Sequence, residues 1–432
     1  MTRTQFNLAG LVLLVVLAIF FFAPFKSLPP SGLASAGLGM DYYTQRPIGR
    51  PPEGTPWISD LLIVDLDGDG WKDVLVADGR LNKVAWIRQI RRGVFEEQDI
   101  GESVAGPAHV EVADLNGDGH LDVLVASMGV IPPSNVKKGA VICLLNDGSN
   151  HFTNRVLLDN VARVTYVAAA DFNKDGRLDL IVGQFGYLEG EIRWMENLGD
   201  WKFASHPLLD LPGTIHAPVA DLTGRGNLDV VALVSQDSEE VHAFMNDGAG
   251  HFRDRVLYGS TNKDYGSSGL SIGDVNQDGR PDIIYTNGDG FDYGTPGPRP
   301  WHGIQWLENL GDGKFTYHRV ADFPGAYSPV LADLNGDGRP DLLACSGFND
   351  WNNLAAVSLM AFENDGQGKF IPHALAHAPT HLIVVKAADM FNDGRIELVT
   401  GAFMFTPPFD RVSRITLWEH VAQLGKTAGE RQ

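Results

Sequence analysis

The sequence has few cysteines and a deficit of positive charge. Its 432 residues include only two cysteines, Cys143 and Cys345, and no Cys-x-x-Cys pattern. We therefore expect no disulfide framework and interpret both as small buried residues. Lys and Arg number 34 against 54 Asp and Glu, for a formal net charge of −20. This charge argues against nucleic acid as a partner, because phosphates require a basic face, and it suits the binding of divalent cations.

Familiar catalytic motifs and helical patterns are also missing. The sequence has no nucleophile elbow, P-loop, dinucleotide-binding motif or His-Glu-x-x-His. No segment after residue 26 has convincing helical periodicity. The 49 glycines and the 44% of hydrophobic residues are typical of a packed, turn-rich chain. We therefore predict an all-β fold.

The N-terminus contains an uncharged run of 18 residues, residues 8–25. As a helix it would span about 27 Å, just enough to cross a bilayer core. Residues 1–26 are therefore predicted to be a membrane anchor, a single N-terminal transmembrane helix that leaves the rest of the chain outside the cytoplasm, periplasmic or extracellular. The alternative is a signal segment cleaved after Ala36, which would secrete the protein. Residues 27–40 are rich in Pro, Ser and Gly and are predicted to be a flexible linker.

An Asp-rich signature recurs seven times at intervals of about 50–60 residues, as expected for a repeat architecture. It has the form Asp-x-Asp/Asn-x-Asp-Gly-x-x-Asp and begins at Asp65, Asp114, Asp171, Asp221, Asp274, Asp333 and Asp389. Alternating apolar segments flank each copy and predict strands A and B of a repeat. A second pattern, Asn-x-Gly-x-x-x-Phe, predicts a hairpin between strands C and D, since Asn and Gly tolerate the positive φ of a tight turn. It begins at Asn146, Asn197, Asn246, Asn309 and Asn364.

Four strands in each of seven units predict a seven-bladed β-propeller of four-stranded blades. The last unit has no fourth strand of its own before the chain ends in residues 423–432, which we expect to be a disordered tail. Residues 42–48 resemble a fourth strand, and we predict that they close the last blade. The propeller is thus predicted to cover residues 41–422, and we expect it to be monomeric.

The repeated motifs resemble those of a known family. The alternation of the Asp-rich loop with Trp-x-Glu-Asn-x-Gly, found at Trp194 and again at Trp306, is similar to the FG-GAP/VCBS repeat family, whose members resemble the propeller of integrin α-subunits. The resemblance covers about residues 41–420. It implies the fold and not one function, because adhesion proteins, lectins and polysaccharide lyases share it.

The Asp-rich loops are predicted to bind calcium. Ca²⁺ takes six to eight oxygen ligands, and alternate short acidic side chains on a tightly turned loop can converge on one ion. Hydrogen bonds from Asp side chains to the backbone, without metal, are the alternative. Five loops, each with a structural Ca²⁺ site, carry a complete set: Asp65, Asp67, Asp69 and Asp73; Asp114, Asn116, Asp118 and Asp122; Asp171, Asn173, Asp175 and Asp179; Asp274, Asn276, Asp278 and Asp282; and Asp333, Asn335, Asp337 and Asp341.

Two loops depart from this pattern. The seventh has Phe391 at position three, which makes its occupancy doubtful. The fourth has Arg225 at position five, where a carboxylate belongs. We predict that Arg225 replaces the ion by pairing with Asp221 or Asp229.

The face opposite the Asp-rich loops carries the irregular insertions and is the predicted ligand face. Its candidate ligand-binding residues are His109, Arg163, Tyr166, His216, Tyr293, Trp301, Trp351 and His381. Packing of the aromatic side chains against one another is the alternative.

Three functions remain open from the sequence. The first is a non-catalytic module that binds a protein or a glycan, with no catalytic residues, and the second is a purely structural subunit of an assembly. The third, implied by the resemblance, is a polysaccharide lyase-like enzyme. In that case His109, Tyr166 and His216 would transfer protons and Arg163 would neutralise a uronate.

Overall fold

The computed structural model describes residues 38–236, 238–291 and 293–421. The predicted membrane anchor, most of the predicted linker, the Ala36 cleavage position and the predicted tail lie outside these residues. Every regular element in the described part is a β-strand. Accordingly, the described residues contain no helix with the length and hydrophobicity needed to span a bilayer.

The strands form seven separate antiparallel sheets, which we number as blades in chain order. Blade 1 is β2 (Ile58–Val64), β3 (Asp73–Asp78), β4 (Lys83–Arg91) and β5 (Val94–Ile100); blade 2 is β6 (Pro107–Ala113), β7 (Asp122–Ser127), β8 (Gly139–Asn146) and β9 (Phe152–Val161); blade 3 is β10 (Val164–Ala170), β11 (Asp179–Gln184), β12 (Glu191–Asn197) and β13 (Phe203–Leu209); blade 4 is β14 (Thr214–His216), β15 (Val219–Ala220), β16 (Asp229–Val234), β17 (Glu240–Asn246) and β18 (Phe252–Gly259); blade 5 is β19 (Ser267–Gly273), β20 (Asp282–Asn287), β21 (Gly303–Gly311) and β22 (Lys314–Asp322); blade 6 is β23 (Ala326–Ala332), β24 (Asp341–Ser346), β25 (Leu359–Asn364) and β26 (Phe370–Ala376); and blade 7 is β27 (Leu382–Ala388), β28 (Glu397–Ala402), β29 (Ile415–His420) and β1 (Tyr43–Pro47).

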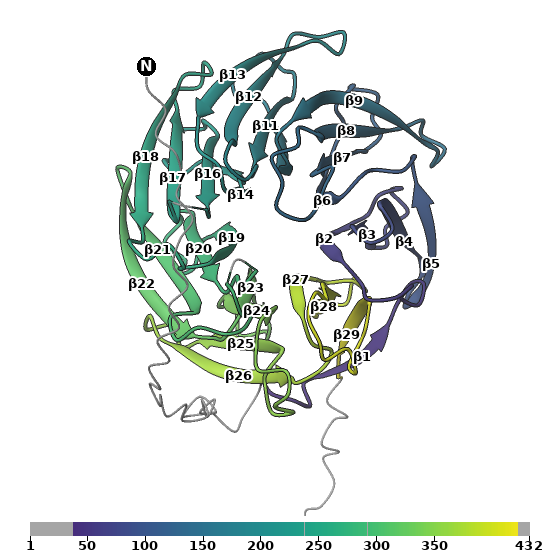
Figure 1. The fold of residues 1–432 in the computed structure, drawn as a ribbon, viewed down its shortest axis with the longest axis vertical. Helices are drawn as coiled ribbons and strands as arrows, with labels where there is room; N and C mark the ends of the chain where they lie inside the picture. Colours follow the sequence, from purple (N-terminus) through teal and green to yellow (C-terminus); the bar gives the residue numbers. More distant parts are fainter. Residues whose placement is uncertain (1–37, 237, 292, 422–432) are drawn as a thin grey trace, which may run out of the picture. The chain divides into compact units, whose positions relative to one another are not determined.

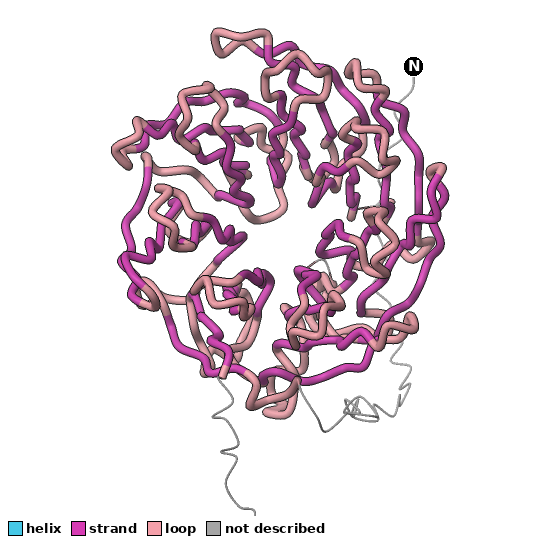
Figure 2. Tube along the Cα trace, turned by 180° about the vertical axis from the view of Figure 1, so that it is seen from behind, coloured by secondary structure: helices cyan, strands magenta, loops and turns pink. Residues whose placement is uncertain are grey.

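The sheets are arranged radially around a central axis, with the first strand of each blade innermost (Figure 1). The view from behind shows only strands and loops in the described part (Figure 2). The all-β, seven-bladed propeller predicted from the sequence is therefore confirmed. In blade 4 the inner strand is split into β14 and β15, because Pro218 lies between them and cannot donate a ladder hydrogen bond.

The core lies between neighbouring blades. All six residues of the second strand are buried in every blade, for example in β7 and β20. The hydrophobic clusters combine side chains of two adjacent sheets, such as Trp86 of blade 1 with Val123 of blade 2. Cys143 and Cys345 are buried free thiols in this core. Each blade is thus stabilised mainly by its neighbours.

The last Asp of each loop joins three strands of its own blade. Asp122 accepts the Leu115 N–H at 3.2 Å with Oδ2 and the Asn146 N–H at 2.9 Å with Oδ1. The same pair of hydrogen bonds recurs at Asp73, Asp179, Asp229, Asp282 and Asp341. These buried carboxylates connect the end of the first strand, the start of the second and the end of the third.

The Asn of the hairpin pattern has a different role from the one predicted. Positive φ occurs at the glycine two residues later, such as Gly311 (φ 80°), and not at Asn309. Instead, Asn309 donates to Pro281 O (3.0 Å) in its own blade and to Leu222 O (2.9 Å) in the preceding blade. Asn246 and Asn364 make equivalent bonds between blades. These side chains therefore fasten neighbouring sheets.

Ring closure combines strand pairing with buried charge. β1 is the outermost strand of blade 7 and pairs antiparallel with β29, from Tyr43 opposite His420 to Pro47 opposite Thr416. Between blades 7 and 1, the buried Arg414 donates to Asp78 (2.9 Å) and to Glu97 (3.0 Å). The two ends of the described chain thus meet in one blade that is tied to its neighbour.

Candidate functional site

Each Asp-rich loop is ordered by hydrogen bonds to its own backbone. In blade 2, Asp114 accepts the N–H groups of Asp118 (3.0 Å) and Gly119 (2.9 Å). Gly119 has φ 90°, and no other atom lies within 4 Å of the position that a Cβ would occupy. Glycine therefore permits the sharp turn that directs the side chains toward one point.

The loop of blade 1 brings three carboxylates together. One oxygen each of Asp65, Asp67 and Asp73 lie within 4.8 Å of one another. Asp65 Oδ1 is buried without a hydrogen-bond partner. An all-oxygen set of this kind fits a hard cation such as Ca²⁺. The loops of blades 2, 3, 5 and 6 carry Asn at position three and offer an amide oxygen there instead.

The last Asp of the loop is costly to ionise in isolation. Burial raises the pKa of Asp73, Asp282 and Asp341 to about 6, although backbone hydrogen bonds act in the opposite direction. A bound cation would stabilise the charged form of these groups.

The two unusual loops differ from the other five. The predicted pairing of Arg225 is wrong, since no ion pair within the described residues joins its guanidinium to Asp221 or Asp229. Its backbone N–H donates to Asp221 instead (3.1 Å). In the seventh loop, Phe391 is buried in the core with Arg92 over its ring, and Asp393 pairs with Arg92 (2.6 Å). Position three of that loop is thus part of the core.

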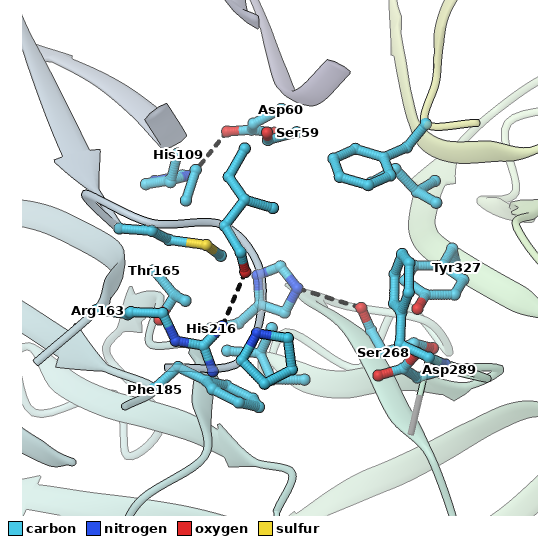
Figure 3. A pocket seen from close by; sticks show the side chains of 18 of the residues that line it. Ser59, Asp60, His109, Arg163, Thr165, Phe185, His216, Ser268, Asp289 and Tyr327 are labelled. Carbon is cyan, nitrogen blue, oxygen red and sulfur yellow. Dashed lines mark hydrogen bonds and ion pairs between the residues drawn. The ribbon is translucent and has the colours of Figure 1, made fainter. Parts of the chain in front are cut away.

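On the opposite face, a cavity of about 290 Å³ lies where the inner strands begin (Figure 3). Its walls include four of the insertions, represented by Ile131, Phe185, Phe291 and Phe403. Since each inner strand begins near the cavity and ends at an Asp-rich loop, the two candidate sites occupy opposite faces of the propeller.

Blades 1 to 4 share a register shift in their first strand, next to which a polar side chain points toward the axis. In blades 1 to 4 the pairing of the first strand with the second shifts register immediately before one residue, which is Asp60, His109, Tyr166 and His216 in turn. These four residues therefore occupy equivalent positions. Asp60 was missed by the sequence analysis, although its place in the repeat could have identified it.

His109 and Asp60 form a buried pair beside the cavity. His109 Nδ1 lies 2.7 Å from Asp60 Oδ2, and Lys386 Nζ lies 3.5 Å from Asp60 Oδ1. Burial opposes the charged forms of both groups. Lys386 and His109 outweigh this effect and lower the pKa of Asp60, while Asp60 and Glu111 raise the pKa of His109. The pair is therefore held in its charged form.

Tyr166 and His216 continue this cluster. The Tyr166 ring stacks on His109 at 4.0 Å and meets the His216 ring edge-on at 5.8 Å. His216 Nε2 lies 3.4 Å from Ser268 O. Burial, aided by the charge of His109, lowers the pKa of His216 to about 4. His216 is thus neutral at pH 7, and its environment differs from that of His109.

Arg163 holds loops in place. It donates to Gly186 O (2.9 Å from Nε) and to Ile131 O (2.9 Å), and its guanidinium lies over the Phe185 ring. These bonds join insertions of blades 2 and 3 at the cavity wall.

The remaining four predicted residues form two separate clusters. Tyr293 and Trp301 both donate to Asp264 O, at 2.7 and 2.9 Å. Trp351 and His381 are buried against each other with ring centroids 5.3 Å apart. Of the eight predicted residues, His109, Arg163 and His216 line the cavity, and Tyr166 packs against two of them.

Aromatic rings form the wall of the cavity that faces this polar cluster. Phe291 of blade 5 meets Phe403 and Phe405 of blade 7 edge-on, at 5.8 and 5.4 Å. Trp57 stacks on the same two rings. The cavity is therefore amphipathic, with an aromatic side and a polar side.

The fold and the repeated loops define a repeat-built β-propeller. The model of the FG-GAP-like repeat family matches residues 65–125, 221–285 and 286–344, so these three stretches are FG-GAP-like repeats. The resemblance noted from the motifs is confirmed, and the seven blades are consistent with a propeller of the integrin α type. A search of curated proteins finds no match.

Proposed function

We propose that this propeller is a non-catalytic binding or scaffold module that presents its cavity face to a protein or glycan ligand. The observation that carries the proposal is the amphipathic cavity at the axis. A volume of about 290 Å³ accepts one sugar ring or one large side chain of a partner protein. Aromatic rings suit the apolar face of such a group, and His216 and nearby hydroxyl groups suit its polar edge.

Exposed apolar side chains around the cavity support the same proposal. Tyr187, Phe291 and Phe405 line the cavity and are exposed, and Leu188 and Leu354 are exposed in insertions of the same face. Rigid scaffolds commonly bind partners through such loops.

The remaining parts of the proposal concern the scaffold. The five complete loops would each hold a structural Ca²⁺ and stiffen the face opposite the cavity. The hydrophobic run at residues 8–25 would tether the propeller outside the cytoplasm, or would secrete it if cleaved after Ala36.

A glycan array and a pull-down of extracytoplasmic proteins test the ligand face. We expect Phe405→Ala and Tyr187→Ala to lose most of the binding. Leu310→Ala is the matched control, because Leu310 is equally exposed but lies on a hairpin at the opposite face. Equal loss in all three variants, or no loss in the cavity variants, would contradict the proposal.

Acid–base catalysis is the second candidate, and the two histidines favour it. The pKa of His109 is raised and that of His216 is lowered, as an acid and a base require. Against it, His109 Nε2 is buried and Arg163 is engaged with backbone carbonyls. Incubation with uronate polysaccharides tests it. Ultraviolet absorbance of an unsaturated product that disappears in His216→Ala would support a lyase.

A further inference from the structure

One side chain of the third strand reaches the Asp-rich loop of its own blade. Glu196 of β12 and Glu308 of β21 each directly precede the Asn of the hairpin pattern, Asn197 and Asn309. Glu308 Oε1 accepts Asn276 Nδ2 at 3.1 Å, and Glu196 Oε1 accepts Asn173 Nδ2 at 3.5 Å. Asn173 and Asn276 occupy position three of their loops, which is a predicted metal-ligand position.

Each glutamate is itself held from the fourth strand. His206 Nε2 lies 2.9 Å from Glu196 Oε2, and His318 Nε2 lies 2.8 Å from Glu308 Oε2. Both imidazoles stack on the Trp of the Trp-x-Glu-Asn motif with ring centroids 4.6 Å apart. The position of the glutamate is therefore held by the fourth strand as well as by its contact with the loop.

The contact adds a second acceptor to the one that orients the asparagine amide. In both blades Nδ2 donates to the carboxylate of position five, at 3.2 Å in blade 3 and 3.1 Å in blade 5, as well as to the glutamate. Oδ1 is thereby directed into the loop, where it accepts the N–H of position five at 3.2 Å in both blades. Only the oxygen of an amide can bind Ca²⁺. The glutamate thus helps to present the atom that the ion requires.

Blade 1 has the same contact with different chemistry. Position three is Asp67, and the third-strand residue is Arg88, whose Nη2 lies 2.5 Å from Asp67 Oδ2. Asp67 Oδ1 is left to accept the N–H of position five at 3.3 Å. In both arrangements, Asn with Glu and Asp with Arg, a third-strand side chain of complementary chemistry contacts the side chain at position three of the loop. Blade 2 has Leu145 at the third-strand position, so Asn116 is oriented by Asp118 of its own loop alone: Nδ2 donates to Asp118 Oδ2 at 2.8 Å, and Oδ1 accepts the N–H of position five at 2.9 Å.

We infer that Glu196, Glu308 and Arg88 are positioning residues that orient the third ligand of their metal loops. The inference rests on the proposed binding of Ca²⁺ by these loops. Outer partners of metal ligands typically change affinity by about 10- to 100-fold. The loop of blade 2 is accordingly expected to bind more weakly than the loops of blades 3 and 5.

The experiment is a calcium titration of the full chain against a chromophoric chelator, which resolves the successive binding constants. Glu196→Leu, which copies Leu145 of blade 2, removes the acceptor and should weaken one binding constant about 10-fold or more without changing the number of ions bound. The exchange Asn173→Asp with Glu196→Arg copies the pair of blade 1 and should restore that constant. If Glu196 were needed only for the stability of the blade, this double variant would not recover the calcium binding constant.

Met245→Leu is the matched control, because Met245 holds the same position in blade 4, where Arg225 interrupts the ligand set. It should leave every binding constant unchanged. If Glu196→Leu also leaves them unchanged while the wild type binds calcium, the inference is overturned and the proposed function stands. A wild type that binds no calcium would overturn both.

Discussion

Removal of the Arg414 side chain should destabilise the closed ring. Arg414 and its partners Asp78 and Glu97 have side chains only 2–4% exposed, so the three charges lie almost wholly out of water. Breaking a buried ion pair typically costs about 3–5 kcal/mol, because the remaining charge has no compensation.

The structure places the expected value near the lower end of this range. Glu97 keeps the Arg50 N–H (2.6 Å) and the Arg50 guanidinium (3.3 Å) as partners. Asp78 Oδ1 keeps the N–H groups of Arg80 and Leu81, but the described contacts give Oδ2 no partner except Arg414. Arg414→Met should therefore lower the free energy of unfolding by about 3 kcal/mol.

Equilibrium unfolding in urea measures this loss. Lys83→Met is the control, because Lys83 pairs with Asp99 in the same blade but is 43% exposed, and a surface pair contributes less than about 1 kcal/mol. Adding Asp78→Asn to Arg414→Met should recover part of the stability. A loss below about 1 kcal/mol for Arg414→Met would refute the reasoning.

Four further outcomes follow from the same structure. Asn309→Ala should cost about 1–3 kcal/mol, measured in urea, because Leu222 O and Pro281 O both lose a donor. His216 and His381, with pKa values lowered to about 4, should each remove about 3 kcal/mol of stability as the pH drops from about 6.5 to 4, because the unfolded chain binds protons there that they do not. The buried Asp73, Asp282 and Asp341, with pKa values raised to about 6, act in the opposite direction, so the measurement is the difference in stability between the wild type and His216→Phe at each pH. This difference should fall by about 3 kcal/mol between pH 6.5 and 4, and a difference that stays constant would contradict the reasoning. Chelation of calcium should lower the temperature of thermal unfolding, and excess calcium should restore it. The free energy of unfolding should fall by about 2.7 kcal/mol for each ion that was present at a hundred times its Kd. Deletion of residues 42–48 should destabilise every blade in thermal unfolding, since β1 pairs along the whole of its length with β29.

Much of the fold could be predicted because the repeat is local. The Asp-rich loop and the strands beside it occupy adjacent positions in the chain, so composition and alternation identify them in each unit. Contacts between units were not predictable in this way. Asn309 has the sequence context of a turn residue, yet its amide bonds with Leu222, far earlier in the chain. The split of β14 and β15 was not predicted, because it depends on a single proline, Pro218, in one blade of the repeat.

The candidate site was predicted less completely. His109, Tyr166 and His216 were identified by their place in the repeat, whereas Asp60 was missed although it holds the equivalent position. Tyr293 and Trp351 were grouped with them only as aromatics of the same face, and the structure separates them. Arg225 was expected to pair because of its charge, but pairing depends on side-chain direction, which the motif does not determine.

The amino-acid sequence by itself determined the number of blades and the positions of their Asp-rich loops, because each depends on residues close together in the chain. Only the tertiary structure decided which side chains of different blades lie together at the axis and which make contacts between blades. Asp60, His109, Tyr166 and His216 are about 50 residues apart from one to the next, and they come together because each blade repeats one register around a closed ring. The aromatic wall likewise joins Phe291 of blade 5 to Phe405 of blade 7 across the blade between them.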